Sequence, residues 1–359
     1  MKNLVLLVKP AAGLCNMQCR YCFYKSASSG RENRIMTPET VDELIRKIKE
    51  YAPSSLSVMF QGGEPTLAGI GFFSDFVKRV KESIDVPVAY SIQTNGLLVD
   101  DEFARFFKEN GFLVGVSLDG NRKTNDRYRL DKNGESVLAR VLTAISILGK
   151  HGVDYYILSV IDDENAREIE STYKYFAKHN FGYLQFIPFV DEGGGVSLSN
   201  ENYETYLKKI FDLWYEDFMS GKYVSVRHID NYIGILTGGN PENCAMCGTC
   251  GHYFVVEANG DIYPCDFYCT DEYKTGSVYD DSPFELSDKH KKFIEESFAV
   301  REKCADCRYY NLCRGGCKRD RINGYTENRY CKAYYGFFEY ALQRMEKIAH
   351  ILKNNGADR

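Results

Sequence analysis

Apolar and polar positions follow a regular pattern over the first two thirds of the chain. Short apolar runs, typical of buried strands, are each followed by a longer stretch of helical apolar spacing. We expect strands at 4–8, 57–60, 88–92, 112–118, 155–160 and 184–190. We expect helices at 38–51, 72–83, 101–109, 136–148 and 166–179.

This alternation favours an α/β fold with a parallel sheet and helical crossovers. The number of strand–helix units fits an incomplete (β/α)6 barrel better than a closed eightfold barrel, and a doubly wound open sheet is the alternative. In barrels the loops that follow the strands carry the chemistry. We therefore expect a functional site in the loops after the first four strands.

The pattern changes after the glycine-rich stretch 191–195 and an amphipathic helix at 201–219. The segment 244–331 has little long periodicity but is rich in cysteine, so we expect a domain organised by metal. A final apolar helix at 334–353 is expected to pack on the barrel. The predicted domains are 1–235 for the barrel with its linking helix, 236–332 for the Cys-rich domain and 333–359 for the C-terminal helix.

The composition mainly excludes classes of partner. The 359 residues are 44% apolar and 26% charged, which is typical of a globular protein. A net charge of -5 gives no broad basic field for nucleic acid. The first apolar run is too short for a signal peptide or a membrane span. We therefore expect a cytoplasmic protein with no nucleic-acid or membrane partner.

The 13 cysteines are the strongest chemical signal in the chain. In a cytosolic protein clustered cysteines indicate metal more than disulfides, and their odd number excludes complete pairing. Cys15, Cys19 and Cys22 follow the first predicted strand. Three thiolates would leave one iron of a 4Fe–4S cluster open to a small molecule. A zinc site or uncommitted thiols are the alternatives, because short Cys spacings also serve zinc.

The remaining cysteines gather in the second part of the chain. They could fill two four-Cys sites with two thiols left over, and their spacing does not distinguish zinc from iron–sulfur clusters. They are Cys244, Cys247, Cys250, Cys265, Cys269, Cys304, Cys307, Cys313, Cys317 and Cys331.

Small and polar residues follow the second, third and fourth strands. In the run 61–66, two adjacent glycines would let the backbone approach a ligand, and Glu64 could accept a hydrogen bond from an ammonium group. Ser117 lies at the end of the fourth strand, and Arg129 beyond it could clamp a carboxylate. Ordinary turns, caps and a solvated surface arginine would explain each of these residues alone.

Taken together, these motifs resemble a known family. The Cys triplet followed by Phe23-Tyr24 resembles the signature of radical S-adenosylmethionine (SAM) enzymes, and residues 61–65 resemble their motif for the methionine amino group. The downstream cysteines resemble a SPASM domain with two auxiliary clusters. The closest resemblance is to the anaerobic sulfatase-maturating enzymes. It rests on 22–24, 61–69, 212–217 and 263–268.

This resemblance implies three 4Fe–4S clusters and SAM as cofactors. The SAM cluster would be held by Cys15, Cys19 and Cys22, one auxiliary cluster by Cys244, Cys250, Cys265 and Cys317, and the other by Cys304, Cys307, Cys313 and Cys331. Cys247 and Cys269 fall outside the pattern and receive no ligand role. Gln61, Gly62, Gly63, Glu64, Ser117 and Arg129 would contact SAM. Tyr24, Arg227 and Asp266 would face the peptide, with Asp266 as the base unless it is a turn aspartate.

The implied reaction is oxidation of a Cys or Ser side chain in a sulfatase to formylglycine. A 5′-deoxyadenosyl radical would take a hydrogen from the β-carbon of that residue. The implied partners are an unfolded sulfatase segment of pattern Cys/Ser-x-Pro/Ala-x-Arg and a flavodoxin- or ferredoxin-type electron donor. The auxiliary clusters would either carry the second electron outward or fold their domain.

Two other functions are kept as alternatives. A radical SAM peptide maturase that forms a thioether or carbon–carbon crosslink would share the barrel and the cluster domain. Such enzymes often carry an extra N-terminal recognition domain, and with a first strand at Leu4 we expect none here, which favours the sulfatase-maturating function. A non-catalytic iron–sulfur electron carrier or a zinc scaffold is the other alternative. The run 61–66 and the three-Cys loop argue against it.

Overall fold

The structure is a computed structural model that describes residues 2–28, 32–189, 197–299 and 302–357. The chain forms two compact units. Unit 1 comprises Met1–Leu118, Asn125–Ile157 and Gly251–Lys292, and unit 2 comprises Asp119–Thr124, Leu158–Cys250 and Phe293–Arg359. Within the described ranges, no helix combines the length and the apolar character needed to cross a bilayer.

Unit 1 is built on a sheet with the strand order β10-β9-β8-β1-β2-β3-β4. Strands β1 to β4 are parallel, β8 pairs parallel with β1, and β8, β9 and β10 pair in antiparallel fashion. The bounds are β1 (Asn3–Val8), β2 (Ser55–Phe60), β3 (Val88–Thr94), β4 (Phe112–Ser117), β8 (Phe254–Val256), β9 (Asp261–Tyr263) and β10 (Gly276–Ser277).

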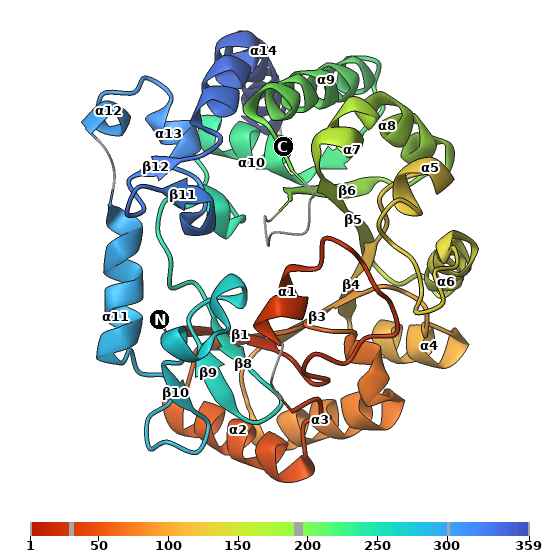
Figure 1. The fold of residues 1–359 in the computed structure, drawn as a ribbon, viewed down its shortest axis with the longest axis vertical. Helices are drawn as coiled ribbons and strands as arrows, with labels where there is room; N and C mark the ends of the chain where they lie inside the picture. The colour runs from red at the N-terminus through yellow and green to blue at the C-terminus, as the bar shows by residue number, and fades with distance from the viewer. Residues whose placement is uncertain (1, 29–31, 190–196, 300–301, 358–359) are drawn as a thin grey trace. The chain divides into compact units, whose positions relative to one another are not determined.

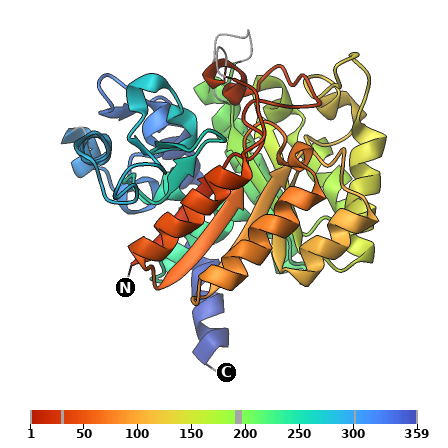
Figure 2. The ribbon, with the colours of Figure 1, turned by 90° about the horizontal axis from the view of Figure 1, so that it is seen from below.

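The helices of unit 1 connect these parallel strands. They are α1 (Phe23–Ala27), α2 (Pro38–Tyr51), α3 (Ile70–Ser83), α4 (Asp101–Glu109) and α6 (Leu138–Lys150), with short 3-10 turns η1 (Pro65–Ala68), η3 (Asp266–Tyr268) and η4 (Asp271–Tyr273). Thr37 and Asp100 begin α2 and α4, because each side chain accepts a hydrogen bond from a backbone N–H of the first turn. Figures 1 and 2 show α2 and α3 lying along the same side of strands β1 to β4.

An aromatic core fixes these helices on the sheet. Alternate residues of β2 are buried, and the last of them, Phe60, places its ring 5.1 Å from Phe73 and 5.2 Å from Phe76 of α3. Phe60 also stacks on Phe112 of β4. Buried aromatic rings in such edge-to-face contacts add directional preference to the hydrophobic term. These contacts join the carboxyl end of β2 to α3 and to the start of β4.

Unit 2 contains the strand pair β6 and β7 and a layer of long helices. Its elements are β6 (Tyr183–Pro188), β7 (Ser225–Val226), α7 (Asp163–Arg167), α8 (Ile169–Lys178), α9 (Asn200–Met219), α10 (Arg227–Leu236), α12 (Glu302–Ala305), α13 (Tyr310–Cys313), β11 (Arg321–Ile322), β12 (Glu327–Asn328) and α14 (Cys331–Ala357), with the short turns η2 (Cys244–Met246), η5 (Glu296–Phe298) and η6 (Lys318–Asp320). Three of the five boundaries between the units fall within α5 (Arg122–Asn125), β5 (Tyr155–Ile161) and α11 (Asp288–Glu295).

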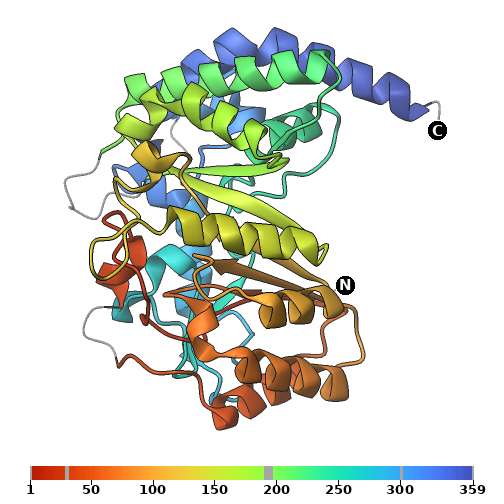
Figure 3. The ribbon, with the colours of Figure 1, turned by 90° about the vertical axis from the view of Figure 1, so that its right-hand side faces the viewer.

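The C-terminal helix packs lengthwise on α9, and α10 also contacts it. Figures 1 and 3 show α9 and α14 side by side. Phe337 of α14 is fully buried, and its ring contacts Phe211 of α9 and Tyr232 of α10. The predicted final helix is thus present, and it begins a few residues earlier than expected, at Cys331.

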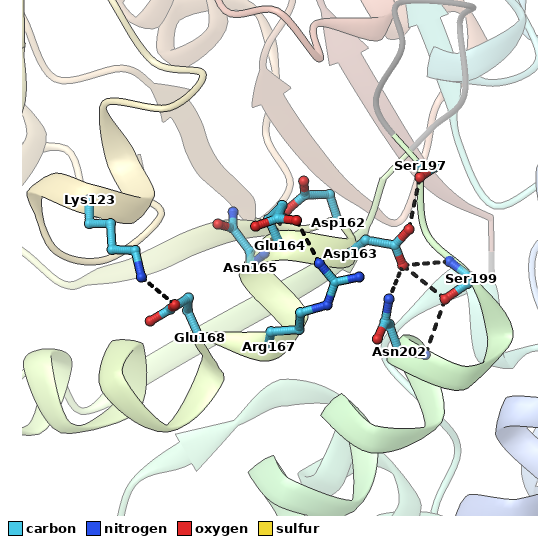
Figure 4. A network of polar contacts seen from close by, with 10 residues as sticks. All are labelled: Lys123, Asp162, Asp163, Glu164, Asn165, Arg167, Glu168, Ser197, Ser199 and Asn202. Atoms are coloured by element: carbon cyan, nitrogen blue, oxygen red, sulfur yellow. Dashed lines mark hydrogen bonds and ion pairs between the residues drawn. The ribbon is translucent and has the colours of Figure 1, made fainter.

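A carboxylate of α7 fixes the start of α9. Asp163 accepts hydrogen bonds from the Ser199 backbone N–H (2.8 Å) and from Asn202 Nδ2 (2.7 Å), while Ser197 Oγ donates to its other oxygen (2.8 Å). Figure 4 shows these three residues converging on Asp163. Ser199 also caps α9 by accepting a hydrogen bond from Asn202 N. The segment that enters α9 is therefore attached to α7, directly after β5.

Most of the predicted elements are present, with bounds that shift by a few residues. The predicted helix 166–179 is divided, because the chain turns at Glu168 between α7 and α8. The end of the sixth predicted strand, at Val190, and the stretch 191–195 lie outside the described residues. The pairing of β8 with β1 was not expected from sequence, because the segment 236–332 was predicted to be organised by metal alone. The domain boundaries derived from sequence stay a prediction.

Candidate active site

The three-Cys loop of unit 1 begins after β1 and leads into α1. Its backbone is held by the segment after β4, because Gln18 N donates to Leu130 O (3.0 Å) and Arg20 N donates to Tyr128 O (3.2 Å). Cys15 and Cys19 are half-buried, and Cys22 is exposed. In the part of the chain that is described, no three His, Cys, Asp or Glu side chains are grouped to hold a single metal ion. The loop thus presents three spaced thiols.

The glycine pair after β2 lies directly against this loop. Gly63 has φ +40°, and a Cβ atom there would lie 2.2 Å from the carbonyl oxygen of Leu14. The next residue, Glu64, donates its backbone N–H to the same oxygen (2.7 Å). Only glycine fits this approach without moving the backbone. The residues 62–64 and the Cys loop are consequently locked together.

Glu64 is buried, and both of its carboxylate oxygens accept hydrogen bonds within unit 1. Thr66 donates through its N–H (3.1 Å) and its hydroxyl (2.6 Å), and the Thr94 hydroxyl donates at 2.7 Å to the same oxygen. The other oxygen accepts from the Asn95 N–H (2.7 Å). Burial raises the pKa of Glu64, although these hydrogen bonds oppose the shift. The carboxylate therefore ties the glycine loop to the end of β3.

Ser117 ends β4, as predicted, and Arg129 lies in the segment that follows α5. Ser117 Oγ accepts a hydrogen bond from Gln93 Nε2 (2.9 Å), which joins the ends of β4 and β3. Arg129 is 5% exposed, and its Nη1 donates to the Tyr21 hydroxyl (3.1 Å) in the Cys loop. Arg129 is thus a buried residue beside the Cys loop, and the interpretation as a solvated surface arginine was wrong.

Asp266 lies at the point where three segments of unit 1 meet. Asp266 is the first residue of η3 and directly follows Cys265. The residue is buried, with 3% exposed. Gln61 Nε2 donates to Asp266 Oδ2 at 2.7 Å, and Lys9 Nζ lies 2.5 Å from Asp266 Oδ1. Phe267 packs on Phe23 of α1 with a ring separation of 4.6 Å. The carboxylate is therefore held by residues from the ends of β1 and β2, and its turn packs on the Cys loop.

Tyr24 is buried in the same cluster. Its hydroxyl donates to the Glu257 carboxylate, with both oxygens at 2.7 Å, and its ring lies 3.4 Å from Lys9 Nζ. Burial, reinforced by Glu257, raises the pKa of Tyr24 well above its usual value, so the phenol stays protonated. Sequence reasoning missed Lys9 and Glu257. A charged residue at the end of an apolar strand, as in Val8-Lys9-Pro10, was the available signal for Lys9.

In unit 2, four cysteines line one cavity of about 660 Å³. They come from α12, from α13 and from the start of α14, and they are Cys304, Cys307, Cys313 and Cys331. Aromatic side chains, among them Tyr309 and Phe338, line the rest of the cavity. Burial, reinforced by the other three thiols, raises the pKa of Cys313 to about 12. Four converging thiols around a cavity of this size fit a cubane cluster, which takes one thiolate per iron.

Among the remaining cysteines of unit 2, Cys244 lies near both Cys250 and Cys317. Burial raises the pKa of Cys244, and Cys250 adds to this shift. Burial also raises the pKa of Cys317 to about 12, with a smaller contribution from Cys244. Cys265, which the resemblance groups with them, belongs to unit 1.

The two cysteines without a ligand role make sulfur contacts to backbone carbonyl oxygens. The Sγ atom of Cys269 is buried and donates towards Cys265 O (3.6 Å), and Cys247 Sγ donates towards Pro241 O (3.7 Å).

Buried Arg321 braces the loops that carry these thiols. Its guanidinium donates to Ser297 O (2.6 Å), Gly315 O (3.0 Å) and Gly316 O (3.0 Å). Ser297 Oγ in turn accepts the Cys250 N–H (2.9 Å). Arg227 begins α10 and donates to Gln185 Oε1 (2.8 Å) within β6. The Arg227 side chain is half-buried in unit 2.

Comparison with known families agrees with this arrangement. Residues 11–176 match the Radical SAM superfamily, and residues 244–308 match the SPASM iron-sulfur cluster-binding domain. The chain therefore has the catalytic domain of radical SAM enzymes and a second cluster-binding domain.

Relatives of known type match over nearly the whole chain. The cysteine-type anaerobic sulfatase-maturating enzyme of Clostridium novyi is 41% identical over 98% of this chain and 99% of its own. The serine-type enzyme of Bacteroides thetaiotaomicron is 31% identical over 99% of this chain and 94% of its own. A solved structure of anSMEcpe with bound AdoMet and Cp18Cys peptide superposes with a TM-score of 0.92 at 37% identity, over 98% and 99% of the two chains.

The chain thus belongs to the anaerobic sulfatase-maturating enzymes. The superposition confirms the α/β partial barrel followed by a Cys-rich SPASM domain and a C-terminal helix. SuiB of Streptococcus suis, at 17% identity and a TM-score of 0.63, shares the fold.

Proposed function

We propose that this enzyme oxidises a cysteine side chain of a sulfatase segment to formylglycine, with SAM as the source of the radical. The chain is 41% and 39% identical to cysteine-type relatives, against 31% and 30% for serine-type ones. The solved relative of TM-score 0.92 was captured with AdoMet and a Cys peptide. These two observations support cysteine as the target.

Cys15, Cys19 and Cys22 are proposed to hold the cluster that binds SAM. A 4Fe–4S cluster with one open iron supplies, when bound, the electron that cleaves SAM to methionine and the 5′-deoxyadenosyl radical. The backbone at Gly62 and Gly63 would receive the methionine amino group. Glu64 acts by holding that loop, because its own oxygens are already hydrogen-bonded.

Ser117 and Arg129 complete the proposed SAM pocket. Ser117 Oγ lies at the end of β4, where it already meets Gln93. The buried guanidinium of Arg129 beside the Cys loop would complement the SAM carboxylate. Tyr24 and Arg227 are proposed to face the peptide.

Two auxiliary 4Fe–4S clusters are proposed, one on Cys304, Cys307, Cys313 and Cys331 and one on Cys244, Cys250, Cys265 and Cys317. The four thiols around the 660 Å³ cavity are the supporting geometry for the first. For the second, Cys244 lies near Cys250 and Cys317 in unit 2, and Cys265 directly precedes Asp266. The external reductant is proposed to be a flavodoxin- or ferredoxin-type protein.

Asp266 is proposed to be the base. Hydrogen-atom loss from the β-carbon leaves a carbon radical. Transfer of the thiol proton to Asp266 and loss of one electron then give a thioaldehyde, and water converts it to the aldehyde with loss of hydrogen sulfide. An auxiliary cluster on the cysteines named above would accept that electron. Proton transfer of this kind requires the carboxylate within hydrogen-bond reach of the thiol. The main support for this proposal is the hydrogen bond from Gln61 to Asp266. It connects the loop that is proposed to bind SAM directly to the proposed base.

The test is anaerobic incubation of the reconstituted enzyme with SAM, a reductant and paired peptides that carry Cys-x-Pro-x-Arg or Ser-x-Pro-x-Arg. Mass spectrometry should find the aldehyde in the Cys peptide. Cleavage of SAM without an aldehyde in either peptide would exclude the maturase function and favour a crosslinking enzyme. Conversion of the Ser peptide alone would overturn the cysteine assignment.

A further inference from the structure

Lys9 is a fully buried lysine in the middle of the candidate active site. It directly follows β1, and its backbone N–H donates to Val256 O of β8 (2.9 Å), while Gln61 N donates to Val8 O (3.0 Å). The position of Lys9 is therefore fixed by the strands on both sides of β1. Burying an ammonium group costs free energy unless the group is paired with an opposite charge. The partner of Lys9 therefore indicates what the residue does.

The ammonium of Lys9 forms an ion pair with Asp266. The Lys9 Nζ to Asp266 Oδ1 distance is 2.5 Å, and the Tyr24 ring faces the same nitrogen at 3.4 Å. Burial lowers the pKa of Lys9, but Asp266, with smaller contributions from Cys269 and Glu257, more than offsets this effect. The pKa of Lys9 is consequently raised, and the side chain stays charged.

The aliphatic part of Lys9 is also enclosed. A Cβ atom at Gly62 would lie 2.7 Å from Lys9 Cγ and 2.8 Å from Cδ. The first glycine of the loop therefore makes room for the lysine as well as for its own φ of +91°. Lys9 thus packs under the proposed SAM loop and reaches Asp266 from there.

We propose that Lys9 is a positioning residue that, together with Gln61, fixes the Asp266 carboxylate in the orientation needed to accept the thiol proton. The proposal rests on the proposed function. Gln61 donates a hydrogen bond to Oδ2, and the ammonium of Lys9 attracts Oδ1 through an ion pair, so both oxygens of the carboxylate are restrained. Both restraints come from the ends of neighbouring parallel strands, which are rigid elements.

Stability alone does not explain this pair. A buried ion pair can often be replaced by apolar residues of similar volume with no loss of stability. Glu257 does not need Lys9 as its partner, because the Tyr24 hydroxyl donates to it. Lys9 therefore acts through Asp266, and removing it should affect the step that Asp266 performs and leave the cleavage of SAM intact.

The experiment compares wild type, Lys9→Met, Asp266→Asn, the double variant Lys9→Met/Asp266→Asn and the control Lys47→Met. Lys47 is a similarly buried lysine of unit 1, on α2, and its ammonium donates to Asp281 O (2.9 Å). The measured quantity is aldehyde formed per 5′-deoxyadenosine in the Cys peptide, with iron content and thermal unfolding as controls of folding. The double variant removes both charges and thus avoids an uncompensated Asp266 carboxylate.

In Lys9→Met we expect aldehyde per 5′-deoxyadenosine to fall about tenfold or more, because small displacements of a catalytic group have effects of this size. Lys47→Met should match wild type. In the double variant, the ratio should equal that of Asp266→Asn, since Lys9 acts through Asp266. An unchanged ratio in folded Lys9→Met, or a further equal fall in the double variant, would overturn the proposal. Absence of aldehyde in wild type would instead refute the proposed function.

Discussion

Gln61 and Asp266 are 205 positions apart in the chain, and Gln61 Nε2 donates a 2.7 Å hydrogen bond to Asp266 Oδ2. The first residue belongs to the loop after β2, and the second follows β9. The parallel pairing of β8 with β1 brings the two segments together in unit 1. This relationship places a carboxylate beside the loop that is proposed to bind SAM.

Asp266→Asn should nearly abolish the aldehyde and spare the cleavage of SAM. An asparagine cannot accept the thiol proton, and general-base catalysis is worth about a hundredfold or more. The measurement is aldehyde and 5′-deoxyadenosine in the same reaction. Asp261→Asn, in β9 of the same hairpin, is the matched control, because Asp261 pairs with Lys274. Equal aldehyde yields in wild type and Asp266→Asn would remove Asp266 from the mechanism.

Gly63→Ala should destabilise unit 1 and lower the iron retained on the Cys loop. The new Cβ would overlap the Leu14 carbonyl oxygen, and φ is positive. We expect a loss of about 2–4 kcal/mol in unfolding free energy, from overpacking and backbone strain together. Gly71→Ala in α3 is the control, because nothing lies within 4 Å of its added Cβ. Equal denaturation midpoints for the two variants would contradict the close approach of the two loops.

Glu64→Gln should cost about 2–3 kcal/mol of stability, since one oxygen becomes an amide that faces buried donors. Those donors are the Thr66, Thr94 and Asn95 groups that now converge on the carboxylate. Chemical denaturation followed by far-ultraviolet circular dichroism measures the change. Glu82→Gln, on the exposed face of α3, should change stability by less than about 0.5 kcal/mol. If Glu64 mainly binds ligand, the two variants would be equally stable without SAM.

His228 should make stability depend on pH. Burial lowers its pKa to about 4, and its Nε2 has no hydrogen-bond partner among the described residues. The unfolded imidazole titrates near its usual value of about 6.5, so unfolding takes up a proton below that pH. The stabilising contribution is complete above about pH 6.5 and falls by about 2 kcal/mol by pH 5.

His228→Phe removes this titration and keeps a ring between Tyr206 and Tyr232. Unfolding free energies at pH 7.5 and pH 5 should then differ by about 2 kcal/mol less than in wild type. The same pH dependence in both proteins would show that His228 is accessible to protons in the folded state.

The sequence predicts the local parts of this site and misses its long-range contacts. The Cys loop and the residues 61–64 are short motifs that follow strands, so their place at the strand ends could be predicted. The Lys9–Asp266 pair depends on β8 joining β1, and no local pattern in 254–256 indicates that partner. Burial of Arg129 likewise depends on the segment 128–130 binding the Cys loop. Periodicity does not contain information of this kind.

The central claim is that a radical generated from SAM acts on the β-carbon of a cysteine. The most direct test uses a Cys-x-Pro-x-Arg peptide with deuterium on that carbon, incubated anaerobically with the reconstituted enzyme, SAM and a reductant. The account predicts deuterium in the 5′-deoxyadenosine together with formylglycine in the peptide. Unlabelled 5′-deoxyadenosine accompanied by formylglycine, or labelled 5′-deoxyadenosine with a crosslinked peptide, would contradict it.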